Sequence, residues 1–375
     1  LFLLASQNRA ANRKTTISYI YLAGSGGYVD AVGMTTTEPW TVGKLISWTQ
    51  KHFGEKGLDA PRLCAEMLLA EALGCERLGL YTRFGEEPPA AALGQFRDWV
   101  RRAAAGEPVA YLVGRREFYS LVFEVTPAVL IPRPETELLV DQAIDFLRSE
   151  AGTVGGYTQK SELGTETPAA PAPAEAEPAA GEPQQQPQPP HTPPAQWTPR
   201  ERATVGGRVW DVCTGSGCIA AAIAKNVPDA AVLATDLSAD ALAVATRNFD
   251  SLHLGETVSA READLLGLSP ADAGGLFDVI VTNPPYVGTN DELGWGVDRE
   301  PAMALFAGDD GLDLIRTMVT QAPAHLRPGG LFAMEFGQGQ ADDIRDLLLA
   351  TGQFAEPTIL RDHNDIERVI TTQKL

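Results

Sequence analysis

The tetrapeptide Asn283-Pro284-Pro285-Tyr286 is the part of this sequence whose residue types most directly suggest chemistry, and it follows an apolar segment at 277–282. Two consecutive prolines deny the backbone both helical and ladder hydrogen bonds, so the chain must leave a strand rigidly here. The Asn283 side-chain oxygen and the Pro284 carbonyl can then accept hydrogen bonds from one NH2 group, and the Tyr286 ring offers a flat face for stacking. The motif predicts a site that holds a planar amide or amino nitrogen.

A nitrogen held in this way is suited to receive a methyl group. An amide nitrogen is a poor nucleophile because its lone pair is delocalised into the carbonyl group. Accepting both N–H bonds in a dry pocket raises the electron density on nitrogen, and holding two reactants in line can lower a barrier by about 7–11 kcal/mol. No strong general base is required, since the proton can leave after transfer. The motif suits glutamine amides and exocyclic amines of nucleic-acid bases equally, so both substrates stay open.

A glycine-rich turn at 211–217 joins a predicted strand to a predicted helix. Glycines at such a turn let a ligand approach the backbone, and nucleotide-type ligands lie across the carboxyl ends of parallel strands. The turn lacks the Gly-Lys-Ser/Thr ending of a phosphate-binding loop, which disfavours ATP and GTP. The turn therefore predicts a different nucleotide-like cofactor.

Acidic residues follow the next two predicted strands. Asp236 can accept hydrogen bonds from both hydroxyls of a ribose; a capping or loop aspartate beside Ser238 is the alternative. Asp264 can accept from an adenine amino group, and Leu265 can cover the ring. An adenosine-containing cofactor is expected, and the strand that ends in Asn283 favours S-adenosylmethionine over NAD.

The elements that must position these residues alternate between strand and helix patterns from 207 to 375. This alternation predicts a doubly wound, mostly parallel α/β sheet with an antiparallel edge. Strands are expected at 209–212, 231–235, 257–262, 277–282 and 331–336, with a final hairpin at 358–360 and 368–372. Helices are expected at 219–226, 238–249, 310–326 and 339–350.

The N-terminal third has a different pattern. Residues 34–107 show helical periodicity and predict a small all-α domain. Residues 108–150 predict a hairpin, with strands at 118–125 and 129–131, and then a connecting helix.

Two further segments are expected to lie outside the folded domains. Eleven of the 27 prolines fall between Pro168 and Pro199, so 151–206 predicts a disordered Pro/Ala/Gln-rich insertion. Residues 1–33 lack steady periodicity, and we expect a disordered or mis-called extension that precedes a natural start at Met34.

Bulk composition excludes several classes. The formal net charge of −19 disfavours nucleic acid as a partner, and no apolar run is long enough for a membrane span. The four cysteines suggest neither a disulfide framework nor a metal site, which is consistent with a cytoplasmic protein.

At this point the sequence resembles the peptide chain release factor N5-glutamine methyltransferases, the HemK/PrmC family. The resemblance implies a seven-stranded Rossmann-like methyltransferase sheet in 207–375, preceded by a helical domain that docks the substrate. It is carried by Tyr111 to Gly114, Arg116 to Tyr119, Ile131 to Glu137, Asn283 to Tyr286, Arg299-Glu300-Pro301 and Glu367-Arg368.

The resemblance implies that S-adenosylmethionine methylates the glutamine of a release factor's Gly-Gly-Gln motif, inserted beside Asn283 and Tyr286. It implies that Arg133 and Glu135 line or brace the pocket mouth, with helix capping as the alternative. Cofactor contacts are expected from Cys213, Thr214, Gly215, Ser216, Gly217, Asp236, Asp264, Leu265 and Asn283.

Two departures from the family pattern accompany the resemblance. Cys213 stands where relatives usually have glycine, and Leu265 replaces an aromatic residue found in some of them. An N6-adenine or guanine-N2 nucleic-acid methyltransferase is the alternative reading, and a non-enzymatic cofactor-binding protein is a third. We expect a monomer.

Overall fold

The computed structural model describes residues 28–29, 35–36, 39–149 and 206–375. It divides into two compact units, Leu1–Val113 and Gly114–Leu375, each of which is described by itself. The predictions for 1–33 and 151–206 lie outside the described residues, apart from Gly206 and the strand β1 (Tyr28–Val29), which pairs antiparallel with β2 (Thr35–Thr36).

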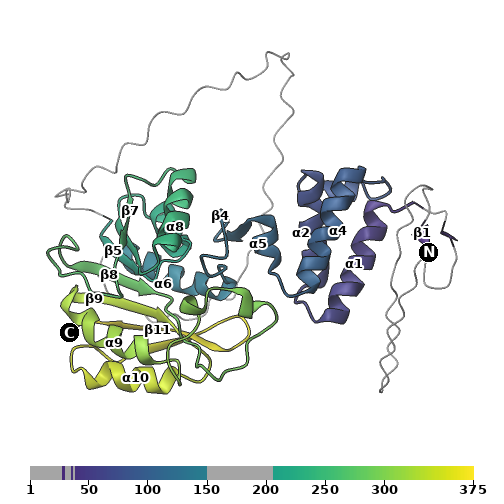
Figure 1. The fold of residues 1–375 in the computed structure, drawn as a ribbon. Coiled ribbons are helices and arrows are strands. Elements are labelled where there is room, and N and C mark those ends of the chain that lie inside the picture. The colour runs from purple at the N-terminus through teal and green to yellow at the C-terminus, as the bar shows by residue number, and fades with distance from the viewer. Residues whose placement is uncertain (1–27, 30–34, 37–38, 150–205) are drawn as a thin grey trace, which may run out of the picture. The chain divides into compact units, whose positions relative to one another are not determined.

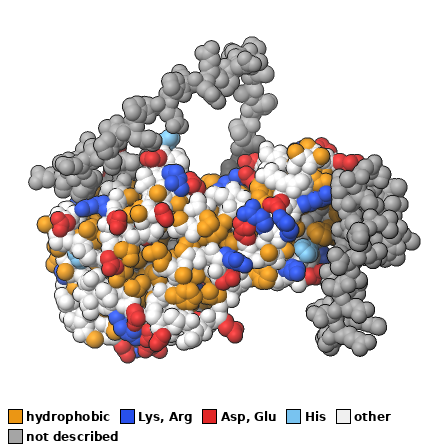
Figure 2. All heavy atoms as spheres, viewed as in Figure 1, with side chains coloured by type: hydrophobic (Ala, Val, Ile, Leu, Met, Phe, Trp, Pro, Cys, Tyr) orange, Lys and Arg blue, Asp and Glu red, His pale blue; other side chains and the backbone are white. Residues whose placement is uncertain are grey.

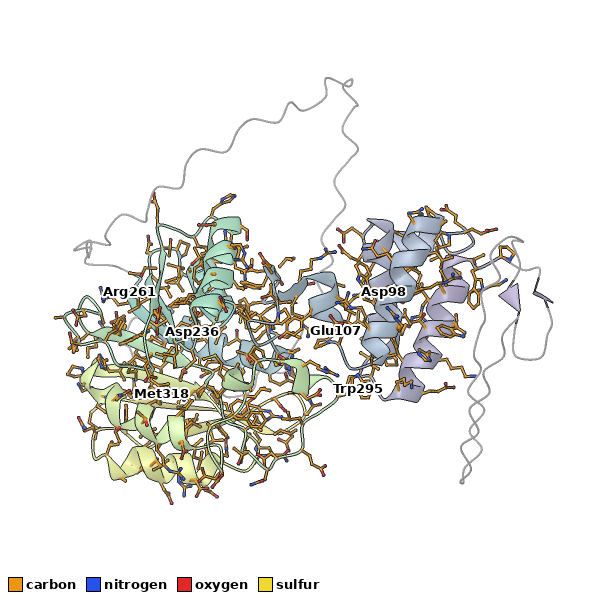
Figure 3. The ribbon with its side chains drawn as sticks, viewed as in Figure 1. Asp98, Glu107, Asp236, Arg261, Trp295 and Met318 are labelled. Atoms are coloured by element: carbon orange, nitrogen blue, oxygen red, sulfur yellow. The ribbon has the colours of Figure 1, made fainter. Side chains whose placement is uncertain are left out.

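The first unit is helical, as the periodicity predicts. Its core joins buried side chains such as Ile46, Leu68 and Phe96 from three different helices. The unit extends through Val113, beyond the expected end at 107, because the last helix buries Leu112 in the same core. Its helices are α1 (Val42–Lys56), α2 (Pro61–Leu73), α3 (Gly79–Thr82), α4 (Ala90–Ala104, where Figure 3 labels Asp98) and α5 (Val109–Val113).

The second unit begins with a hairpin whose predicted position was partly wrong. Strands β3 (Arg115–Phe118) and β4 (Leu121–Glu124) pair across a two-residue turn, and no strand forms at 129–131. Tyr119 and Ser120 both have positive φ, at 51° and 58°. Such a turn usually contains Asn or Gly, so its sequence signal was absent. The expected connecting helix follows as α6 (Glu137–Arg148).

A seven-stranded sheet organises the rest of this unit, and its order is β10-β11-β9-β8-β5-β6-β7. The five strands from β9 to β7 are parallel, and β11 and β10 add antiparallel pairs at one edge. The predicted fold class is therefore confirmed. The strands are β5 (Arg208–Val212), β6 (Ala231–Asp236), β7 (Val258–Glu262), β8 (Phe277–Thr282), β9 (Leu326–Glu335), β10 (Thr358–Arg361) and β11 (Glu367–Gln373).

Helices cover both faces of this sheet (Figure 1). Side chains alternate along β5, so that Val209 packs in one core cluster and Trp210 in the other, and both are fully buried. One cluster includes α6, α7 (Cys218–Asn226) and α8 (Ala239–Ser251). The other includes α9 (Asp313–Gln321) and α10 (Ala341–Ala350). The described part of this unit also contains the single 3-10 turns η1 (Pro134–Thr136), η2 (Val297–Arg299), η3 (Ala302–Ala304) and η4 (Ala322–Ala324).

Helix α9 packs against the carboxyl end of β8. Met318, labelled in Figure 3, is fully buried, and its sulfur lies 3.8 Å from the Thr282 hydroxyl. Thr282 immediately precedes Asn283, so this packing fixes the point at which the chain leaves the sheet.

The surface carries charges of both signs. On the face in Figure 2, Lys and Arg side chains lie among Asp and Glu side chains instead of merging into one basic area. Among the described helices, none has the length and apolar character needed to cross a membrane.

Candidate active site

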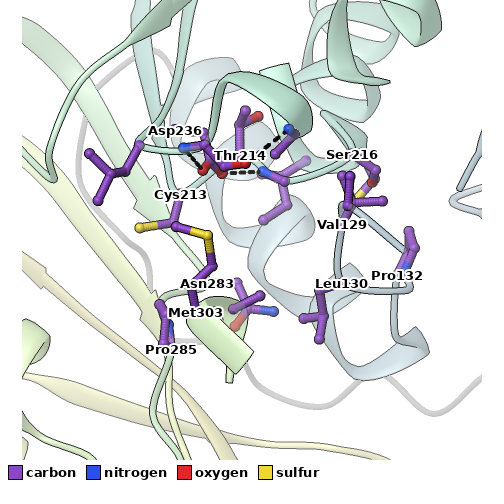
Figure 4. A pocket seen from close by; sticks show the side chains of 18 of the residues that line it. Val129, Leu130, Pro132, Cys213, Thr214, Ser216, Asp236, Asn283, Pro285 and Met303 are labelled. Carbon is purple, nitrogen blue, oxygen red and sulfur yellow. Dashed lines mark hydrogen bonds between the residues drawn. The ribbon is translucent and has the colours of Figure 1, made fainter. Parts of the chain in front are cut away.

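A cavity of about 130 Å³ lies at the carboxyl ends of β5, β6, β7 and β8. The sheet order places it at the switch point, with β6 and β7 to one side of β5 and with β8 and β9 to the other. Ligands of doubly wound folds bind in this crevice. Most of the expected cofactor residues line it: 213–216, Asp236, Asp264, Leu265 and Asn283 (Figure 4).

The glycine-rich turn approaches the cavity through residues with left-handed backbone. Gly215 has φ of +55°, and a Cβ there would point into open space. Gly217, which does not line the cavity, has φ of +80°, and a Cβ there would lie 2.6 Å from the Phe249 ring. Gly217 thus lets α7 approach α8, whereas Gly215 leaves room beside the cavity. Cys213 also has positive φ, at 60°, which is the conformation that favours glycine.

Asp211 stabilises this turn through side-chain hydrogen bonds. One of its oxygens accepts hydrogen bonds from the Thr214 hydroxyl at 2.6 Å and from the Ala220 N–H at 3.1 Å. The side chain is completely buried, and burial raises its pKa to about 7. Sequence reasoning placed Asp211 in the motif and gave it no role.

Asp236 presents its carboxylate at the end of β6. One oxygen accepts from the Gly215 N–H and the other from the Ser238 N–H, each at 2.9 Å. Burial raises the pKa of this carboxyl group, and the two N–H donors oppose that rise. Each oxygen keeps a further lone pair for a hydroxyl donor. The expected cap is also present, since the Ser238 hydroxyl accepts from the Ala241 N–H at 3.2 Å.

The turn after β7 also lines the cavity. Asp264 is exposed and Leu265 is buried, and both contribute to the cavity wall. Leu265 has φ of +48°, so a second non-glycine residue of the wall adopts left-handed backbone. Backbone strain of this kind gathers at ligand sites in folded proteins.

Asn283 is fixed in one orientation at the end of β8. Its side-chain NH2 donates to the Thr136 hydroxyl at 3.2 Å. Its side-chain oxygen is buried and accepts no hydrogen bond from the described residues. Among the described residues that line the cavity, Asn283 and Ser216 each carry such a buried atom. A buried acceptor without a donor is uncommon in folded proteins, so this oxygen is free to accept from a ligand. Asn283 therefore lines the cavity and carries an unused acceptor.

The rest of the motif is divided between cavity and core. Pro285 lines the cavity, whereas Pro284 and Tyr286 are not among its lining residues. The Tyr286 hydroxyl donates to Glu335 at 3.2 Å, and the Tyr286 carbonyl accepts from the Gln340 side chain at 3.0 Å. Tyr286 is thus anchored at both ends.

Glu335 is a buried carboxyl group that sequence reasoning missed. Burial raises its pKa to about 7, while the hydroxyls of Thr136 and Tyr286 and the positive charge of Arg368 act in the opposite direction. Burial and the charge of Glu335 also raise the pKa of Tyr286. The only signal for Glu335 in the sequence is its place at the end of an apolar strand.

Arg133 and Glu135 lie differently from one another. Arg133 lines the cavity and forms an ion pair with Glu300, whereas Glu135 does not line it. Neither side chain caps the following helical turns. Thr136, from the same segment, lines the cavity as well, although it was not expected there.

Comparisons with known proteins agree with this geometry. A family model described as "PrmC N-terminal domain" matches residues 44–114, and one described as "Methyltransferase small domain" matches 199–295. A "Release factor glutamine methyltransferase" of Rhodopirellula baltica is 36% identical over 340 residues, which cover 90% of this chain and 97% of that protein.

Two further relatives carry the same name. The protein of Geobacter sulfurreducens is 34% identical, over 89% of this chain and 96% of its own length. The protein of Xylella fastidiosa is 39% identical, over 80% and 88%. With this identity over nearly their full length, the chain belongs to the release factor glutamine methyltransferase family.

Proposed function

We propose that this chain transfers a methyl group from S-adenosylmethionine to the side-chain amide nitrogen, N5, of the glutamine in the Gly-Gly-Gln motif of peptide chain release factors. The observation that carries this proposal is the buried, unused side-chain oxygen of Asn283 at the cavity wall. The name shared by the relatives supports the choice of substrate.

The residues present fit the proposed methyl donor. The open space beside Gly215 leaves room for a ligand against the backbone, and the Asp236 carboxylate is suited to ribose hydroxyls. Asp264 and Leu265 would meet the adenine. When bound, S-adenosylmethionine supplies an electrophilic methyl group on a positively charged sulfur.

The chain's own residues would bind and orient the acceptor nitrogen. The Asn283 oxygen accepts one N–H of the glutamine amide, and the Pro284 carbonyl accepts the other. Thr136 prevents the Asn283 side chain from rotating its NH2 toward the substrate, because that NH2 is already engaged. Catalysis then rests on orientation and on electron density at nitrogen, and the proton leaves after transfer.

The first unit would dock the body of the release factor. Tyr286, anchored by Glu335 and Gln340, would hold the motif in place beside the inserted glutamine. We further propose that the protein acts as a monomer. A cytoplasmic location follows from a substrate that works in translation. The mixture of charges on the surface in Figure 2 does not favour a nucleic-acid substrate.

Radiolabelled methyl transfer tests the proposal. Purified release factor, a version with the glutamine of its Gly-Gly-Gln motif changed to alanine, and bulk tRNA and DNA are offered separately. We expect label only on the unaltered release factor. Equal labelling of the alanine version, or preferential labelling of nucleic acid, would reject the proposed substrate.

A further inference from the structure

Residues 287–307 follow the Asn283 motif and form an excursion, a long loop whose two ends pair with each other beside the motif. At its base Val287 donates to the Leu305 carbonyl at 2.8 Å, and Ala307 donates to the Val287 carbonyl at 3.0 Å. Within the excursion lies Met303, which lines the cavity although 53% of the residue is exposed (Figure 4). The excursion therefore forms one wall of the cavity on the side of Asn283.

Glu300 connects this wall to a segment far away in the sequence. One carboxylate oxygen accepts from the Ile131 N–H at 2.9 Å, and the other forms an ion pair with the Arg133 guanidinium. The Glu300 side chain is only 2% exposed and that of Arg133 is 32% exposed. A buried carboxylate is tolerated when it is paired and hydrogen-bonded in this way.

The partners of Glu300 belong to the facing wall. Leu130, Pro132 and Arg133 line the same cavity as Met303 and Ala304, and in Figure 4 Leu130 and Pro132 lie across from Met303. Glu300 thus joins two walls through one backbone and one side-chain contact. The Arg133 guanidinium has five N–H donors in a fixed plane, so pairing with Glu300 also sets the direction of the others.

We propose that Glu300 is a positioning residue for the substrate side of the cavity, which holds the two walls together and aims Arg133 at the carbonyl oxygens of an inserted peptide loop. The inference rests on the proposed function, because it assigns Arg133 to the peptide that carries the methyl acceptor. The cofactor side, formed by the ends of β5, β6 and β7, lies outside this connection.

A matched control for the loss of the Glu300 charge lies at the amino end of β8, the end far from Asn283. Asp278 accepts from the Arg208 N–H with one oxygen and pairs with Arg327 through the other, and its side chain is 8% exposed. Its bonding pattern repeats that of Glu300, but it lies near the amino end of the strand, away from Asn283. Asp278→Asn therefore controls for the loss of a buried, paired charge.

The experiment compares Glu300→Gln, Arg133→Met, their combination and Asp278→Asn in the full chain. Gln can still accept from Ile131 but turns an NH2 toward Arg133, so the connection opens. We expect kcat/KM for release factor to fall at least about tenfold in both single variants, mainly through KM. S-adenosylhomocysteine affinity, measured by calorimetry, stays within about threefold in both, since the cofactor side is intact.

The double variant should be no worse than either single variant, because the two residues act through one contact. Asp278→Asn should lower the melting temperature and leave KM unchanged. If Glu300→Gln matches Asp278→Asn in KM, or if the two single effects add, the assignment is wrong.

Failure of the proposed function can be told apart from failure of the inference about Glu300. A wild-type chain that binds S-adenosylhomocysteine but does not methylate release factor would reject the function alone. Hydrogen exchange then still tests the connection: Glu300→Gln should increase exchange in both 128–133 and 297–304, and unchanged exchange in 128–133 would overturn it.

Discussion

The NH2 of Asn283 is held by the hydroxyl of Thr136, and the Asn283 oxygen accepts no hydrogen bond from the described residues. An amide side chain can rotate by half a turn and exchange its donor for its acceptor at little steric cost. The Thr136 hydroxyl shares its proton with the Glu335 carboxyl group, so toward Asn283 it acts as an acceptor and selects the orientation in which the amide NH2 faces it.

Replacing Thr136 by valine keeps the shape of the side chain and removes the acceptor. One neutral hydrogen bond contributes about 0.5–1.5 kcal/mol, so we expect kcat to fall roughly threefold to tenfold. Steady-state kinetics with saturating S-adenosylmethionine measures the change. Thr136→Ser, which retains the hydroxyl, serves as the control, and an equal loss in both variants would contradict the proposed role.

Asn283→Ala removes the acceptor itself. Loss of one oriented hydrogen-bonding group at a reacting centre lowers kcat by about 10²–10³, and a similar loss is expected here. Cofactor affinity should remain within several-fold by calorimetry. If cofactor binding disappears as well, Asn283 supports the structure instead of the reaction.

The buried Glu335 predicts a dependence of stability on pH. Its pKa in the folded protein, about 7, lies above the ordinary value of 4.5, so its protonated form is favoured by folding. The contribution to stability is complete below the ordinary pKa and is lost as pH rises through about 7.

The side chain in Glu335→Gln cannot ionise, so the stability of this variant should not fall for that reason as pH rises through about 7. We expect its stability relative to the wild type to increase by on the order of 3 kcal/mol between pH 4 and pH 8. Urea unfolding at the two pH values measures the difference. Asp211 also has a raised pKa, but it is present in both proteins and cancels in the comparison. A pH-independent difference would exclude a raised pKa at Glu335.

The left-handed backbone at Cys213 predicts a gain from glycine. An L-residue in this conformation costs roughly 1 kcal/mol relative to glycine, so Cys213→Gly should raise the melting temperature or leave it unchanged despite the lost side chain. Cys213→Ala removes the sulfur but keeps the Cβ, and it should be less stable than the glycine variant. The opposite order would show that the backbone there is unstrained.

Gly215 and Gly217 should respond differently to alanine, although both have positive φ. Gly217→Ala pushes a methyl group into Phe249 and should lower the melting temperature strongly. Gly215→Ala meets open space and should mainly weaken S-adenosylmethionine binding. Thermal unfolding and calorimetry on both variants separate the two roles, and equal losses of stability would contradict the distinction.

Sequence patterns identified the sheet because its parallel strands are buried on both faces and appear as nearly continuous apolar runs. The prediction for β8 matches its observed bounds. Predicted bounds erred where a local signal was weak: β9 starts at Leu326, before the expected 331, because it passes through Pro328-Gly329-Gly330. Those residues are typical of turns, and they form a bulge between the pairing of Leu326 with Phe277 and that of Leu331 with Val279.

The sequence predicted the site residues that lie at the ends of strands. It did not predict the contacts between segments that are far apart in the chain. Cys213 and Asn283 each follow a strand and Asp236 ends one, so the topology alone brings them together. Thr136 reaches Asn283 across 147 positions, and Glu300 reaches Ile131 across 169. No periodicity encodes such contacts, since they depend on how two loops fold over the same cavity.

The described residues on either side of the interval 150–205 lie close together. Gly207 lies directly before β5, and a Cβ on it would be 2.8 Å from the side chain of Leu147, near the end of α6. Because the chain leaves and re-enters the fold at neighbouring points, a longer connection costs little, about 0.6 kcal/mol for each doubling of a flexible loop's length. The junction is thus a permissive position in evolution and in engineering, where a reporter domain could be inserted without separating Thr136 from Asn283.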